Sequence, residues 1–451
     1  MPPTSKNEGT KDKTGRAVPS RRLSRLAGLG GMAVNIAGGI AVNGVKQLAS
    51  GKRPKAADLF MTPSNAMKLT KQLSNMRGAA MKIGQMISMD SGDFLPKEFA
   101  DILAQLRANA QHMPGRQLQQ VLSAEWGGDW IKRFKSFQVR PIAAASIGQV
   151  QRAVLPSGEE LAIKVQYPGV RESIDSDIQN VSALLRLSGL IPAEMDVKPI
   201  IEEGRKQLHQ EADYVREAEY LNRFREILSE DTNFKVPEFY PELSTDKLLA
   251  MSFIKSRPIE DMAGAPQTVR NRIVSLLMSL TLRELFEFKL MQTDPNFANY
   301  GYKKDTDQIV LLDFGASREI EVELAGAYRA LIEAALSGDP EQVFAQMIEM
   351  GFVAKDIISP SRETIIEMIA LAVEPLSQDK TFDFGENPLA MDLRDKGFAL
   401  AGDKSLWHVP PPATVFIQRK LGGIFMLASR LKAQINIAAL AKAHIGETQS
   451  K

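Results

Sequence analysis

Two carboxylates and an amide are grouped around a short apolar run in the second half of the chain. Asp294 is followed five residues later by Asn299, and Asp313 opens an Asp-Phe-Gly tripeptide directly after the apolar run 309–312. In kinases, an aspartate at this spacing before an asparagine handles the nucleophile's proton, and the asparagine and the later aspartate hold magnesium. We predict these roles here. The alternative for Asp294 and Asn299 is a simple Asx turn.

A second Asp-Phe-Gly tripeptide begins at Asp383, so the tripeptide alone is weak evidence. The context separates the two copies. Asp313 follows a predicted buried strand, and its carboxylate should emerge rigidly at the strand end. Asp383 follows the charged stretch 378–382, which predicts a surface loop without a strand.

A lysine lies where a kinase needs one to orient the phosphates of its nucleotide. Two short runs of β-type residues, 150–155 and 161–166, flank Pro156-Ser157-Gly158 and predict a hairpin. Lys164 is the only charge in the second run, where a bare ammonium is costly without a partner. We predict that Lys164 contacts the α- and β-phosphates and pairs with an acid on a following helix.

Acidic residues on the predicted helix 198–228 supply that partner. Glu217 lies four residues after Asp213 and shares its face. Glu211 lies about 240° around the same axis from Glu217, at 100° per residue. One acid can therefore pair with Lys164 while another points elsewhere. For Glu217 alone, the alternative is a solvated helix face.

The segment where a kinase has its glycine-rich phosphate loop reads Ala143-Ala144-Ala145-Ser146-Ile147-Gly148. Backbone approach to phosphate is restricted with one glycine, but the Ser146 hydroxyl and exposed N–H groups can still donate. After Gly315 no Ala-Pro-Glu element follows, and helical sequence resumes by about residue 323. The loop that docks a peptide substrate is missing, which argues against an ordinary protein kinase.

A further lysine lies in the amino-terminal helical region. In the stretch 81–85, Lys82 and Gln85 are three residues apart on one helix face, and Gly78 lies one turn earlier. Glycines inside a helix cost about 1 kcal/mol each. We therefore expect another chain segment to pass close to this helix. Alone, Lys82 would be a surface lysine.

Composition excludes several other kinds of site. The 451 residues include 56 Lys and Arg and 54 Asp and Glu, and this net charge of +2 argues against a nucleic-acid partner. Cysteine is absent, which excludes disulfides, a thiolate nucleophile and sulfur-ligated metals. The four histidines are not at metal-ligand spacing. Carboxylate and lysine chemistry is therefore favoured.

Periodicity predicts an α+β chain in five parts. These are a basic tail at 1–25, a membrane-associated helix at 26–50, a helical extension at 51–138, a smaller lobe with a sheet at 139–254, and a mostly helical lobe at 255–451. Residues 26–45 carry no charge, and Leu29, Met32, Ile36 and Ile40 form one apolar stripe. This stripe, behind basic residues, favours an interfacial helix. A helix buried against the domain is the alternative.

Together these motifs resemble the UbiB family of atypical kinases. The resemblance runs from about Arg21 to Leu431 and is carried by 81–85, 143–146, 162–164, 211–213, 293–299 and 313–315. The sequence Met-Gln-Thr-Asp-Pro-Asn at 291–296 is similar to the family's coenzyme Q branch. The resemblance implies a protein-kinase-like two-lobe fold in which the helical extension covers the active site. It also implies the ion pairs Lys164–Glu217 and Lys82–Glu211.

The site that follows has three sets of residues. The catalytic set is Asp294, Lys164 and Lys82, and the magnesium ligands are Asn299 and Asp313. The nucleotide-binding set is Ala143, Ala144, Ala145, Ser146, Lys164, Glu217, Glu211, Asp213, Gln85 and Met251.

The resemblance also implies a function. It implies Mg²⁺-dependent ATP (or ADP) binding and ATPase activity that supports ubiquinone biosynthesis at a membrane. The partners would be a membrane lipid or quinone precursor, other quinone-biosynthesis enzymes and a second copy of the chain. The location would be the cytoplasmic face of a bacterial membrane, which the tail favours, or the mitochondrial inner membrane in a eukaryote. A nucleotide-gated scaffold without phosphoryl transfer is the alternative.

Overall fold

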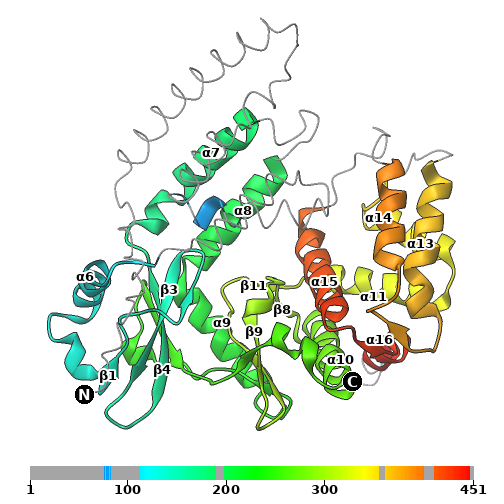
Figure 1. Ribbon diagram of the computed structural model, residues 1–451. Coiled ribbons are helices and arrows are strands. Elements are labelled where there is room, and N and C mark those ends of the chain that lie inside the picture. The colour runs from blue at the N-terminus through cyan, green and yellow to red at the C-terminus, as the bar shows by residue number, and fades with distance from the viewer. Residues whose placement is uncertain are drawn as a thin grey trace, which may run out of the picture. The chain divides into compact units, whose positions relative to one another are not determined.

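The structure is a computed structural model of residues 1–451, in which these residues are described: 76, 78–80, 82, 112–188, 198–354, 361–400 and 411–446. The chain divides into two compact units (Figure 1). Unit 1 comprises Met1–Val215 and Phe239–Phe253, and unit 2 comprises Arg216–Glu238 and Ile254–Lys451. The tail 1–25 and the helix predicted at 26–50 lie outside the described residues.

An antiparallel sheet of five strands forms the centre of unit 1, in the order β1-β3-β4-β6 with β2 also paired to β3. The strands are β1 (Ser136–Phe137), β2 (Ala143–Ala144), β3 (Gly148–Val154), β4 (Glu160–Gln166) and β6 (Leu248–Ser252). β3 and β4 confirm the predicted hairpin, and Gly158 in its turn has a φ of 99°, which favours glycine. β1 joins this sheet, although its residues fall within the range expected to be the helical extension.

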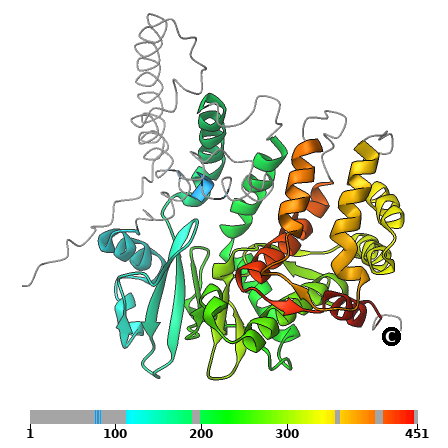
Figure 2. The same cartoon turned by 45° about the vertical axis from the view of Figure 1, so that its right-hand side comes forward.

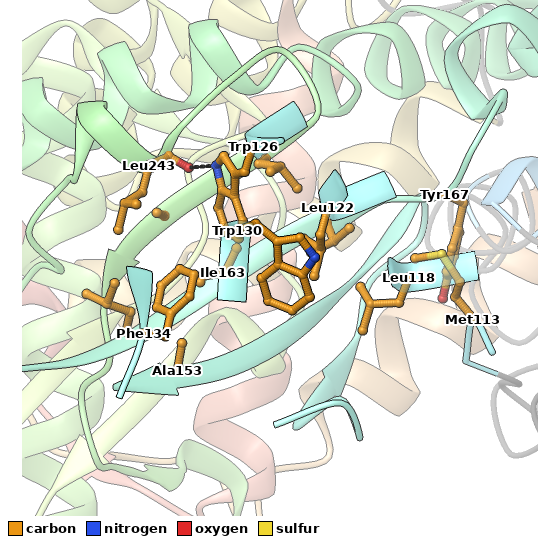
Figure 3. Close-up of a cluster of buried hydrophobic side chains, with 14 residues drawn as sticks. Met113, Leu118, Leu122, Trp126, Trp130, Phe134, Ala153, Ile163, Tyr167 and Leu243 are labelled. Carbon is orange, nitrogen blue, oxygen red and sulfur yellow. Dashed lines mark hydrogen bonds between the residues drawn. The ribbon is translucent and has the colours of Figure 1, made fainter. Parts of the chain in front are cut away.

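Aromatic and aliphatic side chains cover one face of the sheet (Figure 3). Helix α6 (Gly115–Trp126), the short 3₁₀ helices η2 (Trp130–Arg133) and η3 (Pro241–Leu243), and the sheet contribute to this cluster. The Trp126 indole N–H donates to the carbonyl of Leu243 at 3.1 Å. Each fully buried aliphatic side chain contributes about 1.5–3 kcal/mol. Ile163 belongs to the cluster, so the alternation of the strand places Lys164 on the opposite face.

Helices follow the hairpin, but the helix that the sequence predicts at 198–228 is interrupted. Helix α7 (Val170–Ser188) follows β4 directly. The single helix predicted at 198–228 is wrong, because α8 (Lys198–Glu211) and α9 (Tyr214–Ile227) are separate. The carbonyl of Ala212 between them accepts from the Gln166 side chain at 2.8 Å.

This break changes how Glu211 and Glu217 are related. Glu211 ends one helix and Glu217 lies in the first turn of the next, so an angle counted around one axis does not describe them. The sequence also places Arg216–Glu238 in the smaller lobe, whereas this segment belongs to unit 2. The physical reason is that α9 stacks Phe224 on Phe314, with ring centroids 5.2 Å apart.

Unit 2 contains two small sheets near the predicted site and a set of helices. One sheet has the order β5-β10-β9-β7, and β8 pairs with β11 in another. The strands of these two sheets are β5 (Phe234–Lys235), β7 (Arg257–Pro258), β8 (Leu290–Gln292), β9 (Tyr300–Lys303), β10 (Gln308–Leu311) and β11 (Ser317–Glu319). β10 confirms the strand predicted at 309–312.

The helices of unit 2 pack on one another and on these strands. Besides α9, they are η4 (Ile259–Gly264), α10 (Gln267–Arg283), the π-helical turn η5 (Glu284–Phe288), η6 (Phe297–Asn299), α11 (Val322–Ser337), α12 (Pro340–Glu349), α13 (Ser361–Ser377), α14 (Leu389–Leu400), α15 (Pro412–Arg430) and α16 (Ile437–Gly446). α13 and α14 lie side by side (Figures 1 and 2), and α15 packs on α10. None of the helices in the described ranges combines the length and hydrophobicity that a membrane span requires.

Candidate active site

The loop after β8 brings the predicted catalytic residue and one predicted metal ligand together. The Asn299 side-chain amide donates to the Asp294 carbonyl at 3.4 Å, and Asp294 Oδ1 accepts from the backbone N–H of Asn296 at 3.3 Å. The second bond is an Asx turn, so the simpler alternative for Asp294 describes a contact that exists. This hydrogen bond engages one carboxylate oxygen of Asp294, and it is compatible with a role of Asp294 in proton transfer.

The Asp-Phe-Gly segment lies directly beside this loop. The carbonyl of Asn299 accepts from the backbone N–H of Leu312 at 3.0 Å, which places Asp313, the next residue, next to Asn299. Asp313 Oδ1 accepts from the Gly315 N–H at 3.0 Å. A carboxylate and an amide oxygen are hard ligands of the kind that Mg²⁺ prefers. The donors therefore fit a magnesium ion.

The loop and the Asp-Phe-Gly segment are joined a second time by a residue outside the predicted set. The Thr293 hydroxyl donates to the Ala316 carbonyl at 2.6 Å, and the Thr293 N–H reaches the same atom at 3.3 Å. Thr293 is buried. The antiparallel pairing of β8 with β11 continues this connection. The two motifs therefore form one rigid segment of unit 2.

The first turn of α9 holds the Asp-Phe-Gly backbone from another side. Glu217 is 2% exposed, and its Oε1 accepts from the Phe314 N–H at 3.5 Å. Arg216 donates to the Gly315 carbonyl at 2.9 Å and to the Ser317 carbonyl. The alternative that Glu217 lies on a solvated face is wrong. Sequence reasoning missed Arg216, because one arginine on a helix gives no signal of what it contacts.

Lys164 and Met251 lie on the face of the unit 1 sheet opposite the apolar cluster. Lys164 is 7% exposed and opposes Leu249 in β6, while Met251 opposes Ala162 two residues along. Opposed residues of antiparallel strands share a face, so both residues point to the same side of the sheet. The predicted pair of Lys164 with Glu217 joins the two units, and it stays a prediction.

The alanine-rich segment is a short strand followed by a turn. Ala143 and Ala144 form β2 and are exposed, and the N–H of Ala145 donates to the Gly148 carbonyl at 2.9 Å. Gly148 itself opens β3, where a Cβ would lie 2.5 Å from the carbonyl oxygen of Val165. This glycine is therefore required by the close approach of β4, which the sequence does not indicate.

Lys82 is buried beside this turn. It is 2% exposed and forms an ion pair with Glu211 Oε1, and the Ser146 hydroxyl donates to Glu211 Oε2 at 2.5 Å. A Cβ on Gly78 would lie 2.9 Å from the Ser146 carbonyl oxygen, so the predicted close approach at Gly78 is confirmed. The Lys82–Glu211 contact is also confirmed, and the surface alternative for Lys82 is wrong.

The last two members of the predicted nucleotide set are Asp213 and Gln85. Asp213 is half-buried in the break between α8 and α9, where its N–H donates to the Gln210 carbonyl at 3.1 Å. Gln85 lies outside the described residues.

We expect Lys82→Ala and Glu211→Ala each to alter nucleotide affinity or turnover. Removing one member leaves the other charge uncompensated, which costs up to about 3–5 kcal/mol for a fully buried pair. The double variant should cost less than the sum, since it removes both charges. Lys132→Ala is the matched control, because its pair with Asp129 is exposed. Strict additivity, measured by nucleotide titration and denaturant unfolding, would contradict the coupling.

The second Asp-Phe-Gly tripeptide is not in a loop free of strands, contrary to the expectation. β12 (Phe382–Asp383) pairs with β13 (Gln434–Ile435). Asp383 is half-buried, and it accepts from the Gly385 N–H at 2.8 Å and from the Gln434 side chain at 2.6 Å. The Gly385 N–H bond, with that of Gln434, holds the pKa of Asp383 below its usual value. This carboxylate stabilises a turn.

Three features define a protein-kinase-like enzyme. They are a five-stranded antiparallel sheet with a buried lysine, a helix whose buried glutamate contacts an Asp-Phe-Gly segment, and an aspartate–asparagine loop. The family model described as the ABC1 atypical kinase-like domain matches residues 105–347, and the chain belongs to this family. The expected α+β kinase-like fold and the expected family are thereby confirmed.

Individual relatives agree along almost the whole chain. The mitochondrial atypical kinase COQ8 of Saccharomyces cerevisiae is 36% identical over 94% of this chain and 85% of its own length. The mitochondrial atypical kinase COQ8B of Rattus norvegicus is 37% identical over 93% and 80%. The solved structure of Rv3197 with erythromycin from Mycobacterium tuberculosis has a TM-score of 0.59 at 25% identity, covering 84% of this chain and 95% of that chain. The chain is an atypical kinase or ATPase of coenzyme Q biosynthesis.

Proposed function

We propose that this atypical kinase binds Mg²⁺-ATP and transfers or hydrolyses its terminal phosphoryl group at a membrane surface, acting on or extracting a lipid-like quinone precursor. The observation that carries the proposal is the backbone bond from the Leu312 N–H to the Asn299 carbonyl, which places the segment of Asp313 directly alongside the loop of Asp294 and Asn299. Oxygen ligands for magnesium and a carboxylate for the nucleophile then lie in one segment.

Each residue has a separate role in this proposal. Asn299 and Asp313 would hold Mg²⁺, which neutralises charge on the phosphate oxygens. Asp294 would orient the nucleophile and accept its proton. Lys164 would orient the phosphates from unit 1, and the Ser146 hydroxyl and nearby N–H groups would donate to them. Glu217 and Arg216 would keep the Asp-Phe-Gly backbone in place.

A nucleotide-gated scaffold is the second candidate, and one observation favours it. Glu211 holds both the Lys82 ammonium and the Ser146 hydroxyl, so these two donors are engaged before a nucleotide arrives. A nucleotide that competes for Ser146 would change this contact without any phosphoryl transfer. In that case ATP binding itself would be the signal read by a lipid or a partner enzyme.

The test is ATP turnover by the whole chain with Mg²⁺, with and without anionic liposomes. We expect turnover that requires Mg²⁺ and rises with liposomes. Turnover that transfers no label to lipid supports the ATPase form of the proposal, and labelled lipid supports the kinase form. Binding of Mg²⁺-ATP without any turnover would reject phosphoryl transfer and favour the scaffold.

Membrane association is proposed for residues 26–45, which lie outside the described residues. We expect the double variant Ile36→Asp and Ile40→Asp to be released from anionic liposomes in flotation. Each buried aliphatic side chain is worth about 1.5–3 kcal/mol, so two losses should be decisive. The matched control is Ile131→Asp, at a 51% exposed side chain of unit 1. Unchanged flotation of the double variant would favour a helix buried against the domain.

A further inference from the structure

A lysine with no role in the predicted site is buried against the catalytic loop, the segment 292–300 that carries Asp294 and Asn299. Lys420 lies on α15, which packs on α10 and is drawn orange-red in Figure 1. Lys420 is 1% exposed. Its ammonium donates to the Gln292 carbonyl at 2.8 Å, to the Gln292 side-chain oxygen at 3.3 Å and to the Tyr300 hydroxyl at 2.9 Å.

These acceptors belong to the two residues that enclose the catalytic loop. Gln292 ends β8, two residues before Asp294, and Tyr300 begins β9 directly after Asn299. The two residues that bound the loop, Gln292 and Tyr300, are therefore both hydrogen-bonded to the Lys420 ammonium group. A loop whose two ends share one anchor has fewer conformations than a loop held at one end.

A buried carboxylate completes this anchor. Glu284 is 1% exposed, lies 3.2 Å from the Lys420 ammonium, and accepts from the Gln292 N–H at 3.3 Å. Glu284 is the first residue of the π-helical turn η5, which directly follows α10. The contacts of Lys420 therefore connect α15, η5 and the start of the loop. The Gln292 backbone is thus held at its N–H by Glu284 and at its carbonyl by Lys420.

The middle of the loop also rests on α15. Gly423 lies three residues after Lys420, and a Cβ placed there would overlap the Pro295 ring. Pro295 directly follows Asp294 in the sequence. The absence of a side chain at Gly423 therefore allows the loop to seat against the helix next to its catalytic carboxylate.

The stability of the folded protein does not by itself explain the buried ion pair between Lys420 and Glu284. Two charges removed from water are costly, and apolar residues of similar volume are often as stable or more so. Burial by itself would lower the pKa of Lys420, but the attraction of Glu284 and of the Tyr300 oxygen raises it. Burial also raises the pKa of Glu284, and the Lys420 ammonium opposes that shift. What apolar residues could not provide is the set of directed bonds to both ends of the loop.

We propose that Lys420, held by Glu284, is a positioning residue that fixes the 292–300 loop so that Asp294 and Asn299 reach the reacting groups. This inference rests on the proposed function, because it assumes that the loop carries the chemistry. A small displacement of such groups lowers turnover more than it lowers nucleotide affinity, since the phosphates are also held by groups outside the loop.

The experiment compares Lys420→Met with the double variant Lys420→Met and Glu284→Met. The single variant leaves Glu284 buried without its partner and should unfold at a lower temperature. The double variant should recover most of that loss, because no buried charge remains. Its kcat should still fall at least about tenfold, with KM for ATP within about twofold of wild type. Lys396→Met is the matched control at an exposed pair with Glu367 and should change neither value.

A folded double variant with wild-type kcat would overturn the proposal, since the pair would then serve stability only. If the double variant does not fold, Tyr300→Phe decides the matter, because it removes one acceptor and keeps the buried ring. We expect its kcat to fall at least about threefold without a change in melting temperature, and unchanged kcat would overturn the proposal. Asp294→Asn is assayed in parallel. If it keeps full turnover the proposed function fails, whereas lost turnover beside an active Lys420 double variant rejects this inference alone.

Discussion

Asp313→Asn is expected to abolish Mg²⁺-dependent nucleotide binding and turnover, whereas Asp383→Asn is expected to leave both intact. The two aspartates open identical tripeptides, and each accepts from the N–H of the glycine two residues later. Asparagine can accept the same bond, so both variants keep the local turn. The two variants differ in the role of the negative charge that each one removes. Only Asp313 lies beside Asn299 and the catalytic loop.

The expected size of the Asp313 effect follows from its position. Changing a group that merely orients a metal ligand typically costs 10–100-fold in affinity or activity. Removing the charge of the ligand itself should cost at least about 100-fold in turnover. Thermal stabilisation by Mg²⁺-ATP is the direct measurement, with ATP turnover beside it. Equal stabilisation of wild type and Asp313→Asn would contradict the magnesium assignment, as would an equal loss in Asp383→Asn.

The parts of the fold that were predictable depend on short stretches of sequence. The β3–β4 hairpin follows from two apolar runs around Pro156-Ser157-Gly158, and β10 follows from four apolar residues. Asp313 was placed correctly after β10 because strand and tripeptide are contiguous. The aspartate–asparagine spacing likewise lies within one loop. In each case the residues that decide the structure lie within a few positions of one another.

The features that sequence reasoning missed depend on contacts across long stretches of chain. The break between α8 and α9 coincides with the bond from Gln166 to the Ala212 carbonyl, from a strand 46 positions away. No local pattern marks Arg216, whose acceptors are about 100 residues further on. Lys420 reads as an ordinary cation of an amphipathic helix until Gln292, 128 positions away, is seen beside it.

The Lys82–Glu211 pair is instructive because it was predicted for reasons that hold only in part. The glycine at 78 does indicate a close neighbour, the Ser146 carbonyl. The family resemblance supplied the pairing of Lys82 with Glu211. The angular argument that separated Glu211 from Glu217 assumed a continuous helix and fails at Ala212. The two acids point to different partners because they belong to different helices and to different units.

Asp294→Asn is expected to lower kcat strongly while leaving Mg²⁺-ATP binding close to wild type. A positioned general base contributes about 10²–10⁴-fold to proton transfer, and an amide cannot accept the proton. The Asx turn should survive, because the asparagine oxygen can still accept from the Asn296 N–H. Loop structure is therefore preserved while the charge is lost. Because Asp294 acts on the nucleophile and not on the nucleotide, the KM for ATP should change little.

This result separates the two interpretations of Asp294 that the sequence leaves open. If the residue only made an Asx turn, the amide would serve as well as the carboxylate, and kcat would be unchanged. The matched control is Asp305→Asn, in the exposed turn between β9 and β10, where the side chain is 77% exposed. A fall in kcat specific to Asp294 with retained Mg²⁺-ATP stabilisation assigns the residue to the nucleophile. Loss of nucleotide binding instead would assign its charge to the metal site together with Asp313, because in that case the carboxylate is needed before any proton moves.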